Sequence, residues 1–270
     1  MRYLADETAL PIISAALQHD LDSFAWAIDA ELDIDFDFYR SILANSPGIA
    51  MDAGCGTGRL LIEYLKLGFK VEACDICPIM VALCKEKAAA AGFSPTVLHL
   101  PIQELNFANR YSVIFLACGT LMCITDEAEV DLCLTKLFEN LAPGGKLVLS
   151  IMPPSPHHEL PGPFPSPWEH YYDVQLPGDL GELTVDWRST GIDRLNQIIS
   201  EENRYRLIQN GALVREELSP GKHRWHTAEQ LTARLRRIGF SHVDVHWDYA
   251  AEAGIVKPGA VMCFVATRGS

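Results

Sequence analysis

Short apolar runs alternate along the chain with longer segments in which apolar residues recur every three or four positions. The short runs predict strands at residues 48–53, 70–74, 96–100, 112–117 and 146–151. The longer segments predict helices at residues 59–67, 78–91 and 126–141. This alternation is typical of βαβ units, and it therefore predicts a parallel sheet.

Different patterns flank this alternating core. Residues 1–47 are amphipathic and helical in pattern, apart from an acidic stretch at 31–37. After residue 151 the chain becomes rich in proline, which removes backbone donors and excludes helix and central strand. Alternating runs then predict antiparallel strands near residues 171–175, 182–188, 194–200, 204–209 and 213–216. Thr227 and Gln230 form a capping-box pattern that opens a helix ending at Gly239, and runs at 242–247 and 261–267 predict two final strands.

These elements predict an α/β fold with a Rossmann-like sheet of seven strands. The sheet should be mostly parallel, with helices on both faces, an antiparallel last strand and an antiparallel β insertion after the fifth strand. We expect an N-terminal helical cap at 1–47 and a sheet domain built from 48–152 and 223–270. Residues 153–222 are expected to form an insertion, or lid, over the substrate site at the carboxyl edge of the sheet.

Composition narrows the range of partners. The 270 residues are 49% hydrophobic and carry a formal net charge of −13, so electrostatic binding to DNA or to an anionic membrane surface is not expected. A neutral or cationic small molecule suits this charge better. No apolar stretch approaches the roughly 20 residues of a membrane span, and the N-terminus does not have the pattern of a signal peptide. We therefore expect a cytoplasmic protein.

The eight cysteines lie mostly inside apolar runs, which favours buried, reduced thiols. Cys74 and Cys77 form a C-x-x-C pattern, for which a metal or redox role is the alternative. No second C-x-x-C and no pair of histidines that would complete a metal site with it accompany the pattern. We therefore expect no metal site.

The most informative motif is a glycine-rich loop that follows the first predicted strand. Asp52 leads into glycines at 54, 56 and 58, directly before a predicted helix. Glycine allows a ligand to approach the backbone and permits positive φ. Dinucleotide sites require G-x-G-x-x-G or G-x-G-x-x-A, but the third position falls on Arg59 or Leu61 here, which argues against NAD and FAD.

Asp75 ends the second predicted strand, about twenty residues after the glycine loop. Its carboxylate is placed to accept hydrogen bonds from both hydroxyls of a ribose. The simpler alternative is a solvated aspartate that caps the following helix. The combination of Asp52, three alternating glycines and Asp75 favours the ribose role.

On these residues the chain resembles the class I S-adenosylmethionine-dependent methyltransferases of the small-molecule type. Further similarity lies in residues 38–39, 75–80, 141–146 and 223–230, and it thins in the insertion. The resemblance implies that S-adenosylmethionine is the cofactor and S-adenosylhomocysteine the product. It also implies a set of cofactor-binding residues: Tyr39, Asp52, Gly54, Cys55, Gly56, Asp75, Ile76, Met80, Ile102, Gln103, Ala117 and Cys118.

Two segments limit what the resemblance implies about the adenine contact and about the acceptor. Many members of the family carry an acidic residue where Pro101 falls, so Gln103 or a backbone carbonyl is left to contact the adenine amino group. After the fourth strand, residues 117–120 do not resemble the Asn/Asp-Pro-Pro-aromatic motif common in enzymes that methylate exocyclic amines of bases. That difference also argues against DNA methylation.

Methyl transfer from a sulfonium is an in-line displacement, so alignment of the acceptor supplies much of the rate and a general base is optional. The best-placed candidates for such a base are His157, His158 and Tyr172. Tyr171, His223 and His226 are further candidates, although each of these side chains has a simple solvated or packing role as its alternative. Aromatic residues of the insertion, among them Trp168, suit either a lid or a small core.

Three functions fit the sequence. The favoured function is O-, N- or S-methylation of a small molecule. A macromolecular acceptor, such as protein or RNA, would call for a basic groove or a recognition domain, and the sequence shows neither. A non-catalytic module that binds S-adenosylmethionine is the third. The oligomeric state, monomer or homodimer, stays open.

Overall fold

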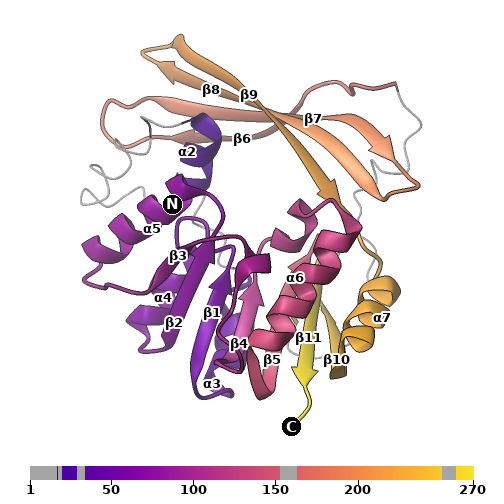
Figure 1. Ribbon diagram of the computed structural model, residues 1–270. Coiled ribbons are helices and arrows are strands. Elements are labelled where there is room, and N and C mark those ends of the chain that lie inside the picture. The colour runs from indigo at the N-terminus through magenta and orange to yellow at the C-terminus, as the bar shows by residue number, and fades with distance from the viewer. Residues whose placement is uncertain (1–16, 18–19, 29–33, 153–162, 251–259) are drawn as a thin grey trace. The chain divides into compact units, whose positions relative to one another are not determined.

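The computed structural model describes residues 17, 20–28, 34–152, 163–250 and 260–270 (Figure 1). The chain divides into two compact units, each of which is described by itself. Unit 1 contains residues 1–32 and 158–223, and unit 2 contains residues 33–157 and 224–270.

Unit 2 is built on a seven-stranded sheet with the strand order β10-β11-β5-β4-β1-β2-β3. Strands β1 to β5 run parallel to their neighbours among themselves, whereas β11 is antiparallel to both β5 and β10. The fold class predicted from the sequence is thus confirmed. The strand bounds are β1 (Ile49–Ala53), β2 (Lys70–Asp75), β3 (Val97–His99), β4 (Tyr111–Leu116), β5 (Leu141–Ile151), β10 (Phe240–Trp247) and β11 (Met262–Arg268).

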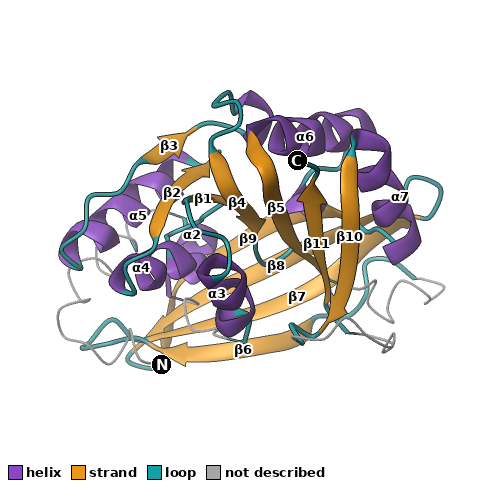
Figure 2. Cartoon of the chain, turned by 90° about the horizontal axis from the view of Figure 1, so that it is seen from below, coloured by secondary structure: helices purple, strands orange, loops and turns teal. Residues whose placement is uncertain are grey.

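Helices cover both faces of this sheet (Figure 2). Their bounds are α3 (Phe36–Ala44), α4 (Arg59–Lys66), α5 (Pro78–Ala90), α6 (Glu127–Asn140) and α7 (Ala228–Ile238), with short 3₁₀ turns η2 (Ile102–Glu104) and η3 (Thr120–Cys123). In β4, Ile114 belongs to the core cluster that includes α6 and α7, and Phe115 to the cluster that includes α3, α4 and α5. Because both faces are buried, the strands are almost continuously apolar, as the sequence shows.

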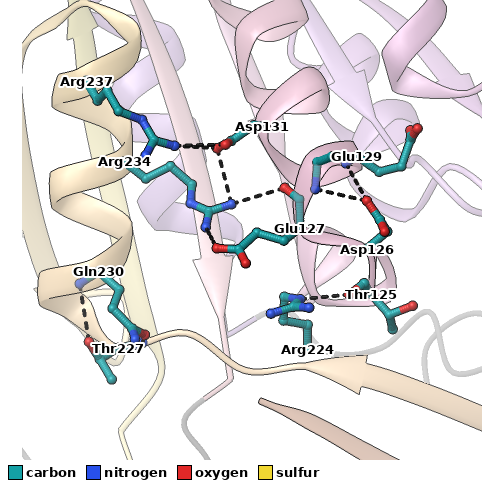
Figure 3. Close-up of polar contacts among 11 residues, drawn as sticks. Thr125, Asp126, Glu127, Glu129, Asp131, Arg224, Thr227, Gln230, Arg234 and Arg237 are labelled. Atoms are coloured by element: carbon teal, nitrogen blue, oxygen red, sulfur yellow. Dashed lines mark hydrogen bonds and ion pairs between the residues drawn. The ribbon is translucent and has the colours of Figure 1, made fainter. Parts of the chain in front are cut away.

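Helix α7 begins at the capping box predicted from the sequence. Thr227 Oγ1 accepts a hydrogen bond from Gln230 N at 3.2 Å, and Gln230 Oε1 accepts one from Thr227 N at 3.1 Å. Figure 3 shows this cap beside the ion pairs that join α7 to α6, in which Arg234 meets Glu127 and Arg237 meets Asp131. These contacts fix α6 and α7 against each other on one face of the sheet.

Unit 1 contains a four-stranded sheet with the order β6-β7-β8-β9. The strands are β6 (Glu169–Gln175), β7 (Glu182–Asp193), β8 (Ile198–Gln209) and β9 (Ala212–Arg224). The antiparallel insertion expected from the sequence is present, but the runs at 194–200 and 204–209 are not separate strands. They belong largely to β8, because the polar residues between them pair with β7: Arg188 Nη2 bonds to Glu202 Oε2 at 2.5 Å.

Helix α2 (Leu21–Ile28) also belongs to unit 1. Its Asp22 accepts hydrogen bonds from Tyr205 Oη at 2.7 Å and from Ser219 Oγ at 2.8 Å, which ties it to β8 and β9. Residues 1–47, expected to form one helical cap, are therefore divided between the two units, because α3 packs on the large sheet instead. No described helix has both the length and the apolar character needed to cross a bilayer.

Candidate active site

The carboxyl ends of three neighbouring strands come together in unit 2. From β1 the chain continues to β2 and β3 on one side of the sheet and then to β4 and β5 on the other, so the strand order reverses beside β1. Ligands of open α/β sheets bind at such reversal points. The residues after β1 (54–58, the glycine loop) and after β4 (117–119, the β4 loop) therefore line the candidate site.

The glycine loop folds over the end of β2 and against the segment after β4. The backbone N–H groups of Gly54 and Cys55 donate to Cys74 O at 2.8 and 3.0 Å. Gly54 has φ +81°, and a Cβ there would lie 2.4 Å from Thr120 Cγ2, so only glycine fits. Gly56 has φ +53°, but a Cβ there would have no protein atom within 4 Å. The loop is thus packed at Gly54 and open at Gly56.

Asp75, the last residue of β2, borders this open position. Its Oδ2 accepts a hydrogen bond from Gly56 N at 2.8 Å, and its Oδ1 accepts one from Cys77 N at 2.8 Å. The two bonds fix the half-buried carboxylate beside the glycine loop, and each oxygen retains a further lone pair. The next side chain, Ile76, is 69% exposed and offers an apolar surface. This pairing suits a ribose with an attached aromatic base.

Asp52 lies at the base of the loop and is almost completely buried. Burial raises the pKa of Asp52 to about 8; Arg59 opposes this change, whereas Asp75 and Asp35 reinforce it. The buried carboxyl group of Asp52 is therefore a weaker acid than that of an ordinary aspartate.

Several predicted cofactor-binding side chains point into the core. Tyr39 is 1% exposed, and its hydroxyl donates to Leu116 O at 3.3 Å. Cys55 and Ile102 are also buried, so only their backbone is available to a ligand. Gln103 donates from Nε2 to Glu129 Oε2 at 3.2 Å.

The other predicted residues of this set lie closer to strand ends. Met80 is half-buried in the first turn of α5, and Ala117 directly follows β4. Cys118 has φ +50°, an uncommon conformation for a residue with a side chain. The structure thus gathers Gly54, Gly56, Asp75 and the β4 loop at one edge of the sheet.

The candidate bases that the structure describes belong to both units. His157 and His158 lie outside the described residues. Tyr172 is on β6 of unit 1, with its ring 5.1 Å from that of Tyr171. His223 Nδ1 lies 2.6 Å from Glu201 Oε1 in the same unit. His226 in unit 2 is buried, and burial lowers its pKa to about 4.

The aromatic and basic residues of the insertion are engaged in its own packing. The guanidinium carbons of Arg188 and Arg204 lie 4.2 and 4.5 Å from the centroid of the Trp168 ring. Arg204 Nη2 also bonds to Asp186 Oδ2 at 2.6 Å. These contacts favour a structural role for this part of the sheet.

Sequence reasoning missed two polar pairs at the glycine loop, one buried and one partly buried. Arg59, the first residue of α4, bonds through both terminal nitrogens to the carboxylate of Asp35, at 2.7 and 2.6 Å. Lys87 Nζ on α5 donates to Thr57 Oγ1 at 3.0 Å, and both residues are buried. No sequence signal links these partners, because 24 and 30 residues separate them.

Cys74, the first cysteine of the C-x-x-C pattern, is buried near the end of β2. Burial raises the pKa of Cys74 to about 12, which opposes the thiolate form that a metal needs. Within the described part of the chain, no group of three or more His, Cys, Asp or Glu residues is arranged to hold a metal ion.

Comparison with known proteins agrees with this geometry. Residues 50–145 match the family model of a methyltransferase domain. The fold of the chain is that of an S-adenosylmethionine-dependent methyltransferase of solved structure. The matched segment, called the methyltransferase domain below, extends from β1 through the first residues of β5 and includes the glycine loop, Asp75 and the β4 loop.

Two curated relatives align with part of the chain. Over 138 residues it is 29% identical to a demethylmenaquinone methyltransferase of Thermus thermophilus, covering 50% of this chain and 59% of the relative. Over 101 residues it is 28% identical to a Geobacillus sp. protein that carries a methyltransferase name, covering 37% of this chain and 41% of the relative. The aligned segments thus span less than two thirds of both relatives.

Solved structures share the fold over nearly the whole chain, beyond the methyltransferase domain itself. An S-adenosylmethionine-dependent methyltransferase from Clostridium acetobutylicum has a TM-score of 0.72 at 17% identity, covering 92% of this chain and 96% of that one. The sugar N-methyltransferase KedS8 from Streptoalloteichus sp. has a TM-score of 0.69 at 18% identity, covering 93% and 94%.

Proposed function

We propose that the whole chain transfers a methyl group from S-adenosylmethionine to a small-molecule acceptor. The observation that carries this proposal is the open face of the glycine loop at Gly56, which lies beside the fixed carboxylate of Asp75 within the methyltransferase domain. Asp75 would accept the ribose hydroxyls, Ile76 would border the adenine, and the glycine loop would pass beneath the methionine portion.

When bound, S-adenosylmethionine supplies an electrophilic methyl group on a sulfonium. The residues of this chain then have to orient both reactants and exclude water. Holding the acceptor atom in line with the S–CH₃ bond is worth up to roughly 7–11 kcal/mol. The small residues of the β4 loop leave space for the two reactants to meet.

The proposed acceptor carries an amino group. A net charge of −13 favours a cationic partner over an anionic one. Structural neighbours include the sugar N-methyltransferase KedS8 and an amino pentose methyltransferase from Micromonospora echinaspora. A protonated amine becomes a nucleophile once it loses one proton, so a weak base at the site is sufficient for this step.

Calorimetric titration with S-adenosylmethionine and with NAD tests the cofactor. We expect micromolar binding of the first and none of the second. Asp75→Ala should weaken cofactor binding by roughly 1.5–3 kcal/mol, the range for hydrogen bonds to a charged group. Glu63→Ala, which removes an exposed carboxylate from α4, is the matched control and should bind as the wild type does. Unchanged binding by Asp75→Ala would remove Asp75 from the ribose role.

A panel of matched amine, hydroxyl and thiol acceptors, assayed by release of S-adenosylhomocysteine, tests the reaction. We expect turnover with amines first. Binding of the cofactor without turnover on small molecules, proteins or RNA would favour a non-catalytic module. His157→Ala, His158→Ala and Tyr172→Phe then test the candidate bases, because loss of a base lowers kcat without changing the affinity for cofactor.

A further inference from the structure

Arg59 connects three separate segments of unit 2. Its side chain begins at the end of the glycine loop, where α4 starts. Nη1 and Nη2 donate to Asp35 Oδ1 and Oδ2 in the segment before α3, at 2.7 and 2.6 Å. Nη2 also donates to Cys118 Sγ in the β4 loop, at 3.3 Å. One guanidinium therefore joins the glycine loop, the β4 loop and the start of α3.

The position of Asp35 makes this connection rigid. Asp35 is 1% exposed and precedes the first turn of α3, where its carbonyl accepts from Tyr39 N at 3.2 Å. A second contact joins α3 to α4, since Tyr64 Oη donates to Phe36 O at 3.0 Å. A bidentate arginine–carboxylate pair fixes direction as well as distance. The start of α3 is thereby held in one orientation relative to the glycine loop.

Stability alone does not account for this ion pair, in which Asp35 is buried and the Arg59 side chain is 17% exposed. Removing two charges from water costs about as much as their attraction returns, and apolar replacements are often neutral. The pair also contacts a strained part of the backbone. Cys118 has φ +50°, a conformation that costs free energy for a residue other than glycine. Strain of this kind persists only where the surroundings impose it, and Arg59 contacts that residue directly.

We propose that Arg59 and Asp35 are positioning residues for methyl transfer, which set the β4 loop and the start of α3 relative to the glycine loop. This role rests on the proposed function. In the proposed function the two reactants meet at the β4 loop, so a small displacement there misaligns the acceptor. A misplacement of about 1 Å can lower a rate about 100-fold. The cofactor contacts proposed at Asp75 and Gly56 do not involve the pair.

The test uses the double variant Asp35→Leu/Arg59→Met in the full chain, which replaces both charges of the pair with apolar groups of similar size. We expect thermal stability close to that of the wild type, a Kd for S-adenosylmethionine within about threefold, and a kcat lowered about 10- to 100-fold. Arg59→Lys keeps the charge but loses the paired donors, so its kcat should fall between those of the wild type and the double variant.

The control is the exposed pair on α3, Asp37 and Arg40, whose side chains lie 2.9 Å apart and are 79% and 49% exposed. Asp37→Leu/Arg40→Met should retain wild-type kcat. Wild-type kcat in the Asp35/Arg59 double variant would overturn the positioning role; if that variant fails to fold, unchanged kcat in Arg59→Lys would do so. A wild-type protein that binds no S-adenosylmethionine, or turns over no acceptor, would instead contradict the proposed function.

Discussion

At the scale of single residues, the glycine loop offers a contrast between two glycines with different surroundings. Gly54→Ala should lower the free energy of unfolding, because a left-handed alanine costs about 1–2 kcal/mol and its Cβ meets Thr120. Gly56→Ala has the same backbone cost but no such contact, so its main effect should be weaker binding of S-adenosylmethionine. Urea unfolding and calorimetry on both variants measure the two effects.

Gly68→Ala is the matched control for this prediction. Gly68 has φ +84° at the end of α4, and a Cβ there would also have no atom within 4 Å. The control should therefore lose similar stability and keep its affinity for the cofactor. If Gly56→Ala bound S-adenosylmethionine as tightly as Gly68→Ala does, the cofactor would not lie against Gly56.

Asp52 should make stability depend on pH. Burial raises its pKa from 3.8 to about 8 in the folded chain, so the folded state retains a proton that the unfolded state has lost. The contribution is complete below about pH 4 and is lost as pH rises toward 8, by an amount on the order of 5 kcal/mol. Asp52→Asn removes this titration. The difference in urea stability between wild type and variant should change across that window, and a constant difference would contradict the buried ionisation.

At the scale of elements, α5 is joined to the glycine loop by the hydrogen bond from Lys87 to Thr57. Burial lowers the pKa of Lys87 from 10.5 to about 8, and Cys84 opposes this change. Below about pH 8 the lysine is charged in both states, and the folded chain bears the full cost of burying that charge. Between about 8 and 10.5 only the unfolded chain keeps the proton, so stability should rise with pH.

Lys87→Met should abolish this rise, as measured by urea unfolding between pH 7.5 and pH 10.5, a range set by these two pKa values. Lys85→Met, which changes an exposed lysine of the same helix, should retain it. A rise that persists in Lys87→Met would assign the titration to another group.

The elements of the parallel sheet were predictable because buried strands leave long apolar runs. β1 and β2 were placed within one residue of their observed bounds. β5 was placed too short, since Pro143-Gly144-Gly145 has the composition of a turn, yet the strand begins at Leu141, which pairs with Tyr111. At that end β5 pairs with β4, and a strand end that is paired on one side tolerates proline. The sequence alone does not show which strand lies beside it.

The same distinction between local sequence pattern and tertiary fold decides which residues of the site the sequence predicts. The glycine loop and Asp75 were found because their spacing is local and their chemistry is specific to residue type. Arg59 and Asp35 were missed because their pairing depends on the tertiary fold. Asp35 lies in an acidic stretch that appears from composition to be only an interruption between helices. Its burial distinguishes it from the exposed Asp37.

At the scale of the whole molecule, the two units should respond differently to ligands. Unit 2 contains the glycine loop, Asp75 and the β4 loop, so S-adenosylmethionine alone should stabilise unit 2. At a concentration of about 100 Kd the gain is roughly 2.7 kcal/mol. Amides of β1, β2 and β4 that exchange only on unfolding of unit 2 should therefore exchange about 100-fold more slowly.

The lid role expected for residues 153–222 predicts a second step. Hydrogen exchange in β7 and β8 should change less than about threefold with cofactor alone, and should slow clearly once S-adenosylhomocysteine and an amine acceptor are both present. The reason is that a ligand stabilises only the part of the chain that it contacts in the folded state. Exchange measured by segment separates the two steps. If β7 and β8 were unaffected by the ternary mixture while turnover proceeded normally, the insertion would not bind the acceptor, and unit 2 would have to supply the acceptor contacts.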